Sequence, residues 1–393
     1  MNVVGFLSLC TLSLLCTQKA IAWNDLCREA IESTAMSAIT LDRLRRLKVL
    51  LRGHDLVDYT WWPAEVMRRI PQSEPLHKQP QTDKSCQTFD SKCPNGMCLI
   101  GGVKFFFAKL MNSGYSISST QPKFEVPPMK YPKDIFFAPS DNLKYLVVLL
   151  ADMHYPFNLD LKSPDSIGQR KVDLSGFPMW ESESMTKLGT THPPLEEFIS
   201  KVYMPHYIET NGDSWYGAWT NVEVLGSRYK VEQESFNRNT WDNFEIWATE
   251  TANLNCAQII TKNDYTDDPD TIKLSEALLE RIGMLLRFQI VLGGARIAIV
   301  INYILSHREI AYCNKTGMII EKDPSLAYKA EDYGFMVLVL FTLLIVMACV
   351  YFICLAFKQM YNDNIKIHVD YAILRMRERY RQRHKPDLDL HEE

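Results

Sequence analysis

The chain has 393 residues, a net charge of -4 at pH 7 and 47% hydrophobic residues. It is long enough to bury a full core in one or two domains. A nearly neutral chain has no global electrostatic attraction for nucleic acid, so any nucleic-acid contact must be local.

The N-terminal residues resemble a secretory signal. An uncharged apolar run, Phe6 to Leu15, is followed by the small-residue pattern Ala20-Ile21-Ala22. Such a pattern is typical of a signal peptidase site. We expect a signal peptide at residues 1–22 and a mature chain that begins at Trp23.

Hydrophobic periodicity then predicts a mainly helical chain. Leu26 to Leu51 has leucines at helical spacing, and Ser163 to Gly189 is rich in Gly, Pro and Ser and is expected to be a loop or short hairpin. Because strand patterns are scarce, the predicted class is all-α. The other expected helices are Gly101 to Asn112, Asn142 to Met153, Pro194 to Tyr207, Asp242 to Ile260 and Ser275 to Leu305.

A second apolar run, Gly334 to Phe357, contains no charged residue. At about 1.5 Å per residue it can cross a hydrocarbon core of about 30 Å. Glu331 and Asp332 precede it and Lys358 follows it, as the positive-inside bias prefers. A buried core helix is the alternative, but one of this length usually has a polar stripe.

These signals predict a single-pass type I membrane protein of the secretory pathway, at the cell surface or in an endomembrane compartment, with its N-terminal domain lumenal or extracellular. The predicted parts are a signal peptide (1–22), a folded domain (23–310), a juxtamembrane stalk (311–333), a transmembrane helix (334–357) and a cytoplasmic tail (358–393).

Cysteine usage fits an oxidising compartment. Of the ten cysteines, two lie in the predicted signal and two in the predicted span, which leaves an even set outside the cytosol and suggests three disulfides. That set is Cys27, Cys86, Cys93, Cys98, Cys256 and Cys313. The sequence Asn314-Lys315-Thr316 is a glycosylation sequon, so Asn314 is a candidate glycosylation site.

Several short motifs follow one another along the predicted folded domain. They are Trp23, Trp62-Pro63-Ala64-Glu65-Val66, Leu76-His77, Val148 to Asn158 with Asp152-Met153-His154, Met179-Trp180-Glu181, Trp247-Ala248-Thr249-Glu250-Thr251 and Gly294-Ala295-Arg296-Ile297-Ala298. Together they resemble the S1/P1 nuclease family, the zinc-dependent single-strand nucleases of the mung bean nuclease type. That resemblance implies a helical fold like that of bacterial phospholipase C.

The resemblance also implies disulfides and metal ligands. It pairs Cys86 with Cys256 and Cys93 with Cys98. Cys27 and Cys313 are then left over, and a bridge between them would tie the start of the domain to its stalk.

The family uses three zinc ions, and zinc takes four ligands from imidazole, carboxylate or, here, the terminal amine. The corresponding positions retain Trp23, His77, Asp152 and, as a glutamate, Glu181, so each site is incomplete. Other ligand positions hold Ala64, Val148, Asn158, Phe177 and Arg28. Arginine does not ligate metal, and we expect Arg28 to form an ion pair with Asp152. If the match to the family motif around Trp62 is shifted by a residue, Asp58 or Glu65 would supply the carboxylate ligand that is missing at Ala64.

Substrate-contacting positions of the family are also changed: Lys78 replaces a base-stacking aromatic residue and Pro80 a base-reading aspartate. Arg68 or Arg69 could still meet a phosphate. The surviving His77, Asp152 and His154 have a second interpretation, as a buried hydrogen-bonded network that serves the fold alone.

Two functions follow from these patterns. The first is a membrane-anchored ectodomain that is catalytically impaired, has no cofactor, and acts as a binding or scaffold module for a lumenal or extracellular partner. The alternative is a diverged zinc-dependent endonuclease or phosphoesterase acting on single-stranded nucleic acid. There a single zinc would be held by Trp23, His77 and Asp152, with Asp152 as the catalytic remnant. A signalling receptor is a third, weaker interpretation.

The tail contains Tyr371-Ala372-Ile373-Leu374. This matches the sorting signal of a tyrosine followed by a bulky hydrophobic residue, Tyr371 and Leu374, which adaptor proteins bind as an extended strand. An amphipathic helix through the same residues is the other interpretation.

Overall fold

The computed structural model describes residues 23–83, 88–119, 123–133, 135–162, 165–211, 221–257, 259–310 and 324–383. The predicted signal, Cys86, Cys313, Asn314 and the side chain of Cys256 lie outside the described residues. The chain divides into two compact units, residues 1–321 and 322–393. Each is described by itself.

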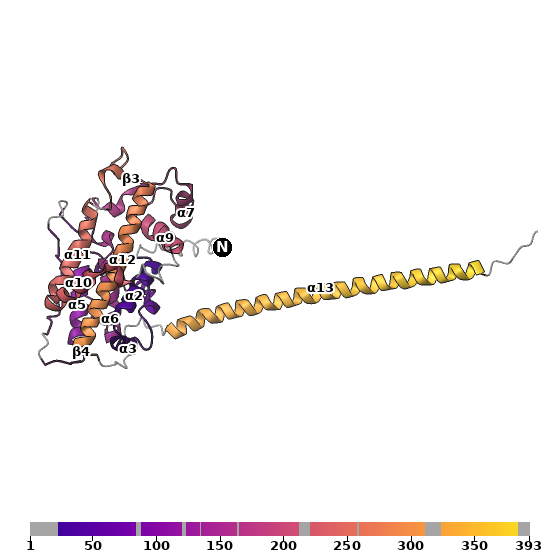
Figure 1. The fold of residues 1–393 in the computed structure, drawn as a ribbon, viewed down its shortest axis with the longest axis horizontal. Helices are drawn as coiled ribbons and strands as arrows, with labels where there is room; N and C mark the ends of the chain where they lie inside the picture. The colour runs from indigo at the N-terminus through magenta and orange to yellow at the C-terminus, as the bar shows by residue number, and fades with distance from the viewer. Residues whose placement is uncertain are drawn as a thin grey trace, which may run out of the picture. The chain divides into compact units, whose positions relative to one another are not determined.

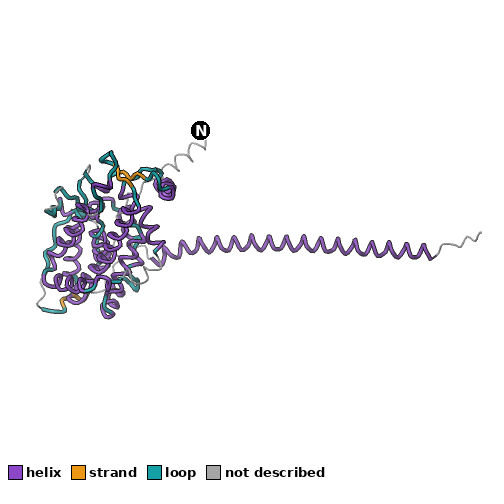
Figure 2. The backbone as a smooth tube through the Cα atoms, turned by 45° about the horizontal axis from the view of Figure 1, so that its top comes forward, coloured by secondary structure: helices purple, strands orange, loops and turns teal. Residues whose placement is uncertain are grey.

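The first unit is mostly helical (Figures 1 and 2), which confirms the all-α class. Its α-helices are α2 Asp25–Ala38, α3 Leu41–Leu50, α4 Trp62–Arg69, α5 Leu99–Asn112, α6 Pro139–Met153, α7 Pro178–Leu188, α8 Leu195–Phe198, α9 Met204–Thr210, α10 Ser227–Arg238, α11 Thr240–Ala257 and α12 Glu276–His307. Shorter helical segments are η1 Val57–Tyr59, η2 Pro71–His77, η3 Pro94–Gly96, η4 Pro156–Leu159, η5 Ile167–Gln169, the π-helical η6 Ile199–Tyr203, η9 Val222–Leu225 and η10 Lys262–Asp264.

Two very short sheets complete the unit. Strand β1 (Tyr115–Ser116) pairs antiparallel with β4 (Arg308–Glu309), and β2 (Lys171–Asp173) pairs parallel with β3 (Thr271–Lys273). Because β3 precedes α12 and β4 follows it, the sheets lie at the two ends of that helix (Figure 1).

Helix α12 is the central element, packed against α2, α6, α10 and α3. Gly294 lets α2 approach closely: a Cβ there would lie 2.5 Å from Thr34 Cβ and 2.6 Å from the Ile31 carbonyl oxygen. Helices α5 and α6 pack as a second pair, with the Phe106 and Tyr145 rings stacked at 4.4 Å. The ends of α2 and α6 carry the candidate site.

The secondary structure predicted from the sequence differs from the observed one in several places. The helix expected from Leu26 to Leu51 is interrupted at Ile39 and Thr40, where the backbone is extended. The Asn302 amide holds the break, donating to the Ala38 carbonyl (3.1 Å) and accepting from the Thr40 N–H (3.4 Å).

The region expected to be a loop or hairpin contains helix α7. Pro178 stands at its start, where the missing N–H is harmless, and Gly189 ends it with φ of +72°. Helix α10 was not predicted at all. Its sequence is polar, and among its residues only Phe236 is buried.

The cysteine predictions have mixed outcomes. The Cys93–Cys98 disulfide is confirmed, with Cα atoms 5.2 Å apart. The bridge from Cys27 to Cys313 is wrong, because Cys27 carries a free thiol on the inner face of α2, fully buried in the core. Burial also raises the pKa of that thiol above its usual range. The Cys86–Cys256 pair stays a prediction.

The described part of the second unit, residues 324–383, is one helix, α13 (Pro324–Arg383). Among the described residues two helices are long and apolar enough to cross a membrane by length and composition: α12 and Leu340–Arg379 of α13. The apolar window of α12 is 78% buried inside the protein, as in a core helix, whereas that of α13 is 0% buried.

Helix α13 includes residues 324–333 of the predicted stalk and continues through residue 383 of the predicted tail. Tyr371 and Leu374 are exposed on it. This tail segment is therefore helical, whereas its amphipathic character and the sorting signal stay predictions.

Candidate functional site

The candidate site lies where the start of α2 meets the end of α6. The Trp23 indole donates from Nε1 to the Ala151 carbonyl at 2.8 Å, and its ring packs on Tyr155 with centroids 4.7 Å apart. Arg28 follows on the first turns of α2, and Asp152 stands in the last turn of α6. Trp23 and Arg28 are each 1% exposed and Asp152 is 0% exposed.

Arg28 joins the two sides of this junction. Its Nε donates to the Trp23 carbonyl oxygen at 3.2 Å, and its Nη2 donates to Asp152 Oδ1 at 2.8 Å. The ion pair expected between Arg28 and Asp152 is thus confirmed. A buried, charge-assisted hydrogen bond of this kind is among the stronger polar contacts in proteins.

The other carboxylate oxygen of Asp152 is also used. His77, at the end of η2, has its Nδ1 2.5 Å from Asp152 Oδ2. Since an ionised carboxylate only accepts, the imidazole carries its proton on Nδ1. Asn158 Nδ2 donates to the Asp152 carbonyl at 3.0 Å. The structure therefore brings together three of the predicted site residues, Trp23, His77 and Asp152.

Three buried polar atoms around Asp152 have no hydrogen-bond partner within the described part of the chain. They are Arg28 Nη1, His77 Nε2 and Asn158 Oδ1. Buried unpartnered groups are uncommon in folded proteins. Here they mark a polar centre in which the residues satisfy only part of one another's hydrogen-bonding capacity.

This donor set does not fit a zinc ion. The Trp23 carbonyl and Asp152 Oδ1, which would have to face the metal, both accept from the Arg28 guanidinium. His77 Nε2 has a free lone pair, but because Nδ1 faces Asp152, Nε2 lies on the side of the ring away from that carboxylate. Among the described residues, no group of three or more His, Cys, Asp or Glu side chains is placed to hold a metal. A permanent cation, Arg28, bonds both the Trp23 carbonyl and the Asp152 carboxylate.

The remaining predicted ligands lie elsewhere. Glu181 is exposed in the first turn of α7 and is not in a ligand cluster with the others. Glu65 bonds Arg68 and Arg69, and its hydrogen bond with Arg68 helps lower the pKa of the carboxyl to about 2. Asp58 accepts from the Asp55 N–H. Neither carboxylate bonds a residue of the site.

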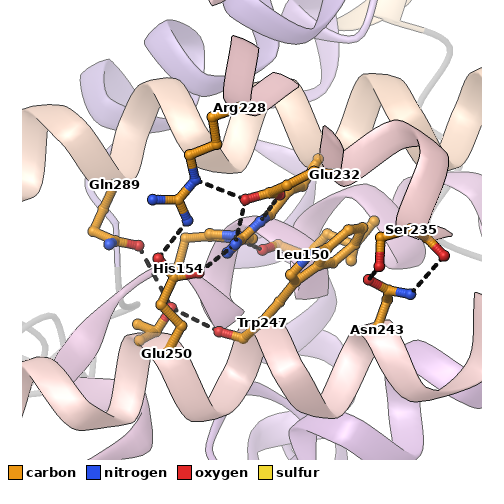
Figure 3. A network of polar contacts seen from close by, with 11 residues as sticks. Leu150, His154, Arg228, Glu232, Ser235, Asn243, Trp247, Glu250 and Gln289 are labelled. Carbon is orange, nitrogen blue, oxygen red and sulfur yellow. Dashed lines mark hydrogen bonds and ion pairs between the residues drawn. The ribbon is translucent and has the colours of Figure 1, made fainter. Parts of the chain in front are cut away.

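His154 belongs to a separate buried network (Figure 3). Its Nδ1 donates to the Leu150 carbonyl (2.7 Å), and its Nε2 accepts from Arg296 Nη1 (3.1 Å). Burial, with the nearby Arg296 charge, lowers the pKa of the imidazole to about 3. The expectation of one network containing His77, Asp152 and His154 is therefore wrong: the side chains form two networks.

Arg296 is the centre of this second network. Its guanidinium bonds both oxygens of Glu232, at 2.7 and 2.9 Å, and also pairs with Glu250. The Trp247 ring lies 5.0 Å from its Cζ. Arg228 pairs with the same two glutamates, so the network ties α10, α11 and α12 together (Figure 3).

The sequence motifs contained Trp247, Glu250 and Arg296 but gave no sign of Glu232 and Arg228. The spacing of Arg228 and Glu232, four residues apart and oppositely charged, is typical of neighbours on one helix face. It could have suggested α10.

Comparison of the chain with models of known protein families and with curated protein sequences finds no match.

Proposed function

We propose that this chain is a membrane-anchored protein with a nuclease-like helical ectodomain of the S1/P1 type, and that this ectodomain binds a partner instead of cleaving phosphodiesters. The observation that carries the proposal is the Arg28 guanidinium, which contacts both the Trp23 carbonyl and the Asp152 carboxylate. In the resembled family these two groups hold a zinc ion.

The charge balance supports this proposal. Asp152 already has the Arg28 cation as its partner. Two like unit charges 4 Å apart repel by about 4 kcal/mol at an effective dielectric constant of 20, and a divalent ion doubles that figure to about 8 kcal/mol. A zinc ion could bind beside Asp152 only if Arg28 moved away, and Arg28 is fixed by two hydrogen bonds in the core.

The second candidate is the diverged zinc-dependent nuclease or phosphoesterase. It is favoured by the convergence of Trp23, His77 and Asp152, the three residues it needs, around one carboxylate. That candidate requires the His77–Asp152 contact to open in addition to the displacement of Arg28.

The two candidates differ in metal content. The full-length chain would be purified without chelator from zinc-supplied cells, and its zinc measured by elemental analysis beside the His77→Ala variant. We expect far less than one zinc per chain in both proteins and no cleavage of single-stranded DNA. One zinc per chain that is lost in His77→Ala, with cleavage of single strands, would establish the nuclease.

The same proposal includes a type I orientation in the secretory pathway, with Leu340–Arg379 containing the span. Its support is the exposed apolar surface of α13, the disulfide in the first unit and the charges that flank the run. The partner of the ectodomain is then lumenal or extracellular, and adaptor proteins would bind the tail.

A further inference from the structure

A cavity of about 700 Å³ opens at the C-terminal end of α12, the end away from β3. It lies between α3, α10, α11 and α12. Its size falls in the range of small-molecule sites, about 300–1,000 Å³. None of Trp23, Arg28, His77 and Asp152 lines it. It is therefore independent of the altered metal centre and of the function proposed above.

Two arginines line this cavity. Arg43 comes from α3 and is half-buried, and Arg238 ends α10 and is exposed. Within the described part of the chain neither forms an ion pair. The cavity also contains one carboxylate, Asp242, in the first turn of α11. Two permanent cations against one carboxylate favour an anionic ligand, and guanidinium groups match the geometry of carboxylate and phosphate oxygens.

The rest of the lining suits a ring that bears hydroxyl groups. Side-chain amides of Gln233, Asn237 and Asn239 offer donors and acceptors. The lining also includes the aromatic rings of Phe124 and Trp241, which are stacked with their centroids 5.5 Å apart. A sugar has polar edges and an apolar face, which the amides and the aromatic rings would complement.

The turn that carries Arg238 and Trp241 is held in place. Asn243, which is 2% exposed, donates from Nδ2 to the Ser235 carbonyl (3.2 Å) and to the Asn239 carbonyl (2.7 Å). Its Oδ1 accepts from the Ser235 hydroxyl at 3.1 Å (Figure 3). The cavity wall is thus preorganised, which reduces the entropy lost on binding.

From these features we propose that the cavity between α3, α10, α11 and α12 binds an anionic sugar, that is, a hydroxylated ring that carries a phosphate or a carboxylate. A nucleoside monophosphate, a sugar phosphate and a sialic acid share this chemistry. Arg43 and Arg238 bind the anionic group, the amides bind the hydroxyls and the aromatic rings pack on the sugar ring.

The test is isothermal titration calorimetry on the full-length chain in a polyoxyethylene detergent, which has no sugar head group. The probes are adenosine 5′-monophosphate, glucose 6-phosphate, N-acetylneuraminic acid, glucose and inorganic phosphate. We expect at least one anionic sugar to bind with a dissociation constant between about 10 µM and 1 mM. The probe that binds identifies the source of the anion.

Matched variants locate the binding. Arg43→Gln and Arg238→Gln should each weaken it by roughly tenfold or more, the effect of losing a charge-assisted contact. Arg45→Gln, an exposed arginine of the same helix α3, and Lys230→Gln on α10 should leave it unchanged. Asp242→Asn should tighten binding by roughly threefold because it removes the one opposing charge.

Three results would overturn the proposal. The first is that no probe binds at 5 mM, about the weakest affinity of a specific small-ligand site. The second is that glucose or inorganic phosphate binds as tightly as every anionic sugar, and the third is that Arg45→Gln weakens binding as much as Arg43→Gln. Thermal unfolding of each variant would check that these surface substitutions leave the fold intact.

Discussion

At the scale of single residues, Arg28 joins two buried parts of the fold. It connects the Trp23 carbonyl, just before α2, with the Asp152 carboxylate on α6. A buried ion pair of this kind need not stabilise a protein more than apolar residues of similar volume would. The removal of one partner is nevertheless costly, because the other charge stays buried.

We therefore expect Arg28→Ala to lower the free energy of unfolding by about 3–5 kcal/mol. Chemical denaturation of the full-length protein, followed by tryptophan fluorescence, measures this loss. The double variant Arg28→Ala/Asp152→Asn should recover part of it, because no unpaired carboxylate remains. Arg45→Ala, on the surface, should stay within about 0.5 kcal/mol of the wild type. A similar small change in Arg28→Ala would show that the ion pair contributes little.

Glu32 is a second buried ionisable group on α2, and it is 3% exposed. Burial raises the pKa of its carboxyl well above the usual value near 4.5, although Arg28 opposes the shift. In the pH window between the unfolded and folded pKa values the unfolded chain binds fewer protons. The contribution of Glu32 to the free energy of unfolding therefore falls as pH rises through that window.

Glu32→Gln removes this dependence. At pH 7, above the unfolded pKa, we expect the variant to be more stable than the wild type. The gain should shrink as pH falls toward 4.5. Denaturation midpoints at several pH values measure it, with exposed Glu209→Gln as the control. Parallel pH curves for Glu32→Gln and the wild type would contradict the argument.

Sequence reasoning found the pair Arg28 and Asp152 because the motifs around both residues anchor their positions. It misassigned His154, since a motif gives the order of residues along the chain but not which buried partner each side chain faces. Arg296, which takes the His154 ring into the second network, is 142 positions away in the chain. Such a contact leaves no local signal.

At the scale of elements, helical periodicity located the helices that bury an apolar face, such as α5, α6 and α12. It failed where another part of the chain decides the local structure. The break between α2 and α3 depends on Asn302 of α12, and the polar helix α10 is fixed by Arg296 and Trp247 from its neighbours. Element boundaries set by such distant contacts cannot be read from periodicity.

The packing of α12 on α2 makes a sharp prediction at Gly294. Helix propensity alone would make Gly294→Ala more stable by about 1 kcal/mol. The added Cβ, however, would meet Thr34 Cβ at 2.5 Å and the Ile31 carbonyl at 2.6 Å. Backbone cannot move aside cheaply, and overpacking costs about 1–3 kcal/mol. The steric cost should therefore exceed the gain in helix propensity.

We expect Gly294→Ala to lower the thermal unfolding midpoint of the full-length protein. Met284→Ala, at a 58% exposed position of the same helix, is the control and should change the midpoint little. A rise of the midpoint in Gly294→Ala would mean that α2 can withdraw from α12 at low cost, and the close approach would then not be needed for the fold.

At the scale of the whole molecule, two helices of the described part of the chain satisfy the same length and composition test for a membrane span, and they differ in burial. The apolar surface of α12 is covered by α2, α6 and α10. It is therefore already removed from water within the fold, and no lipid is needed to bury it. The side chains of residues 340–357 are exposed. A contiguous exposed apolar surface of that length fits a lipid environment.

Deletion of residues 334–357 should accordingly release the protein into the culture medium, whereas the wild-type chain should stay in the membrane fraction after alkaline extraction. A chain that lacks residues 358–383 is the control and should remain membrane-bound, since α13 keeps its apolar part. In the type I orientation Asn314 faces the lumen, so Asn314→Gln should increase electrophoretic mobility by the loss of one glycan. If the protein without residues 334–357 stays in the membrane, another segment anchors it, and the orientation proposed for the ectodomain loses its basis.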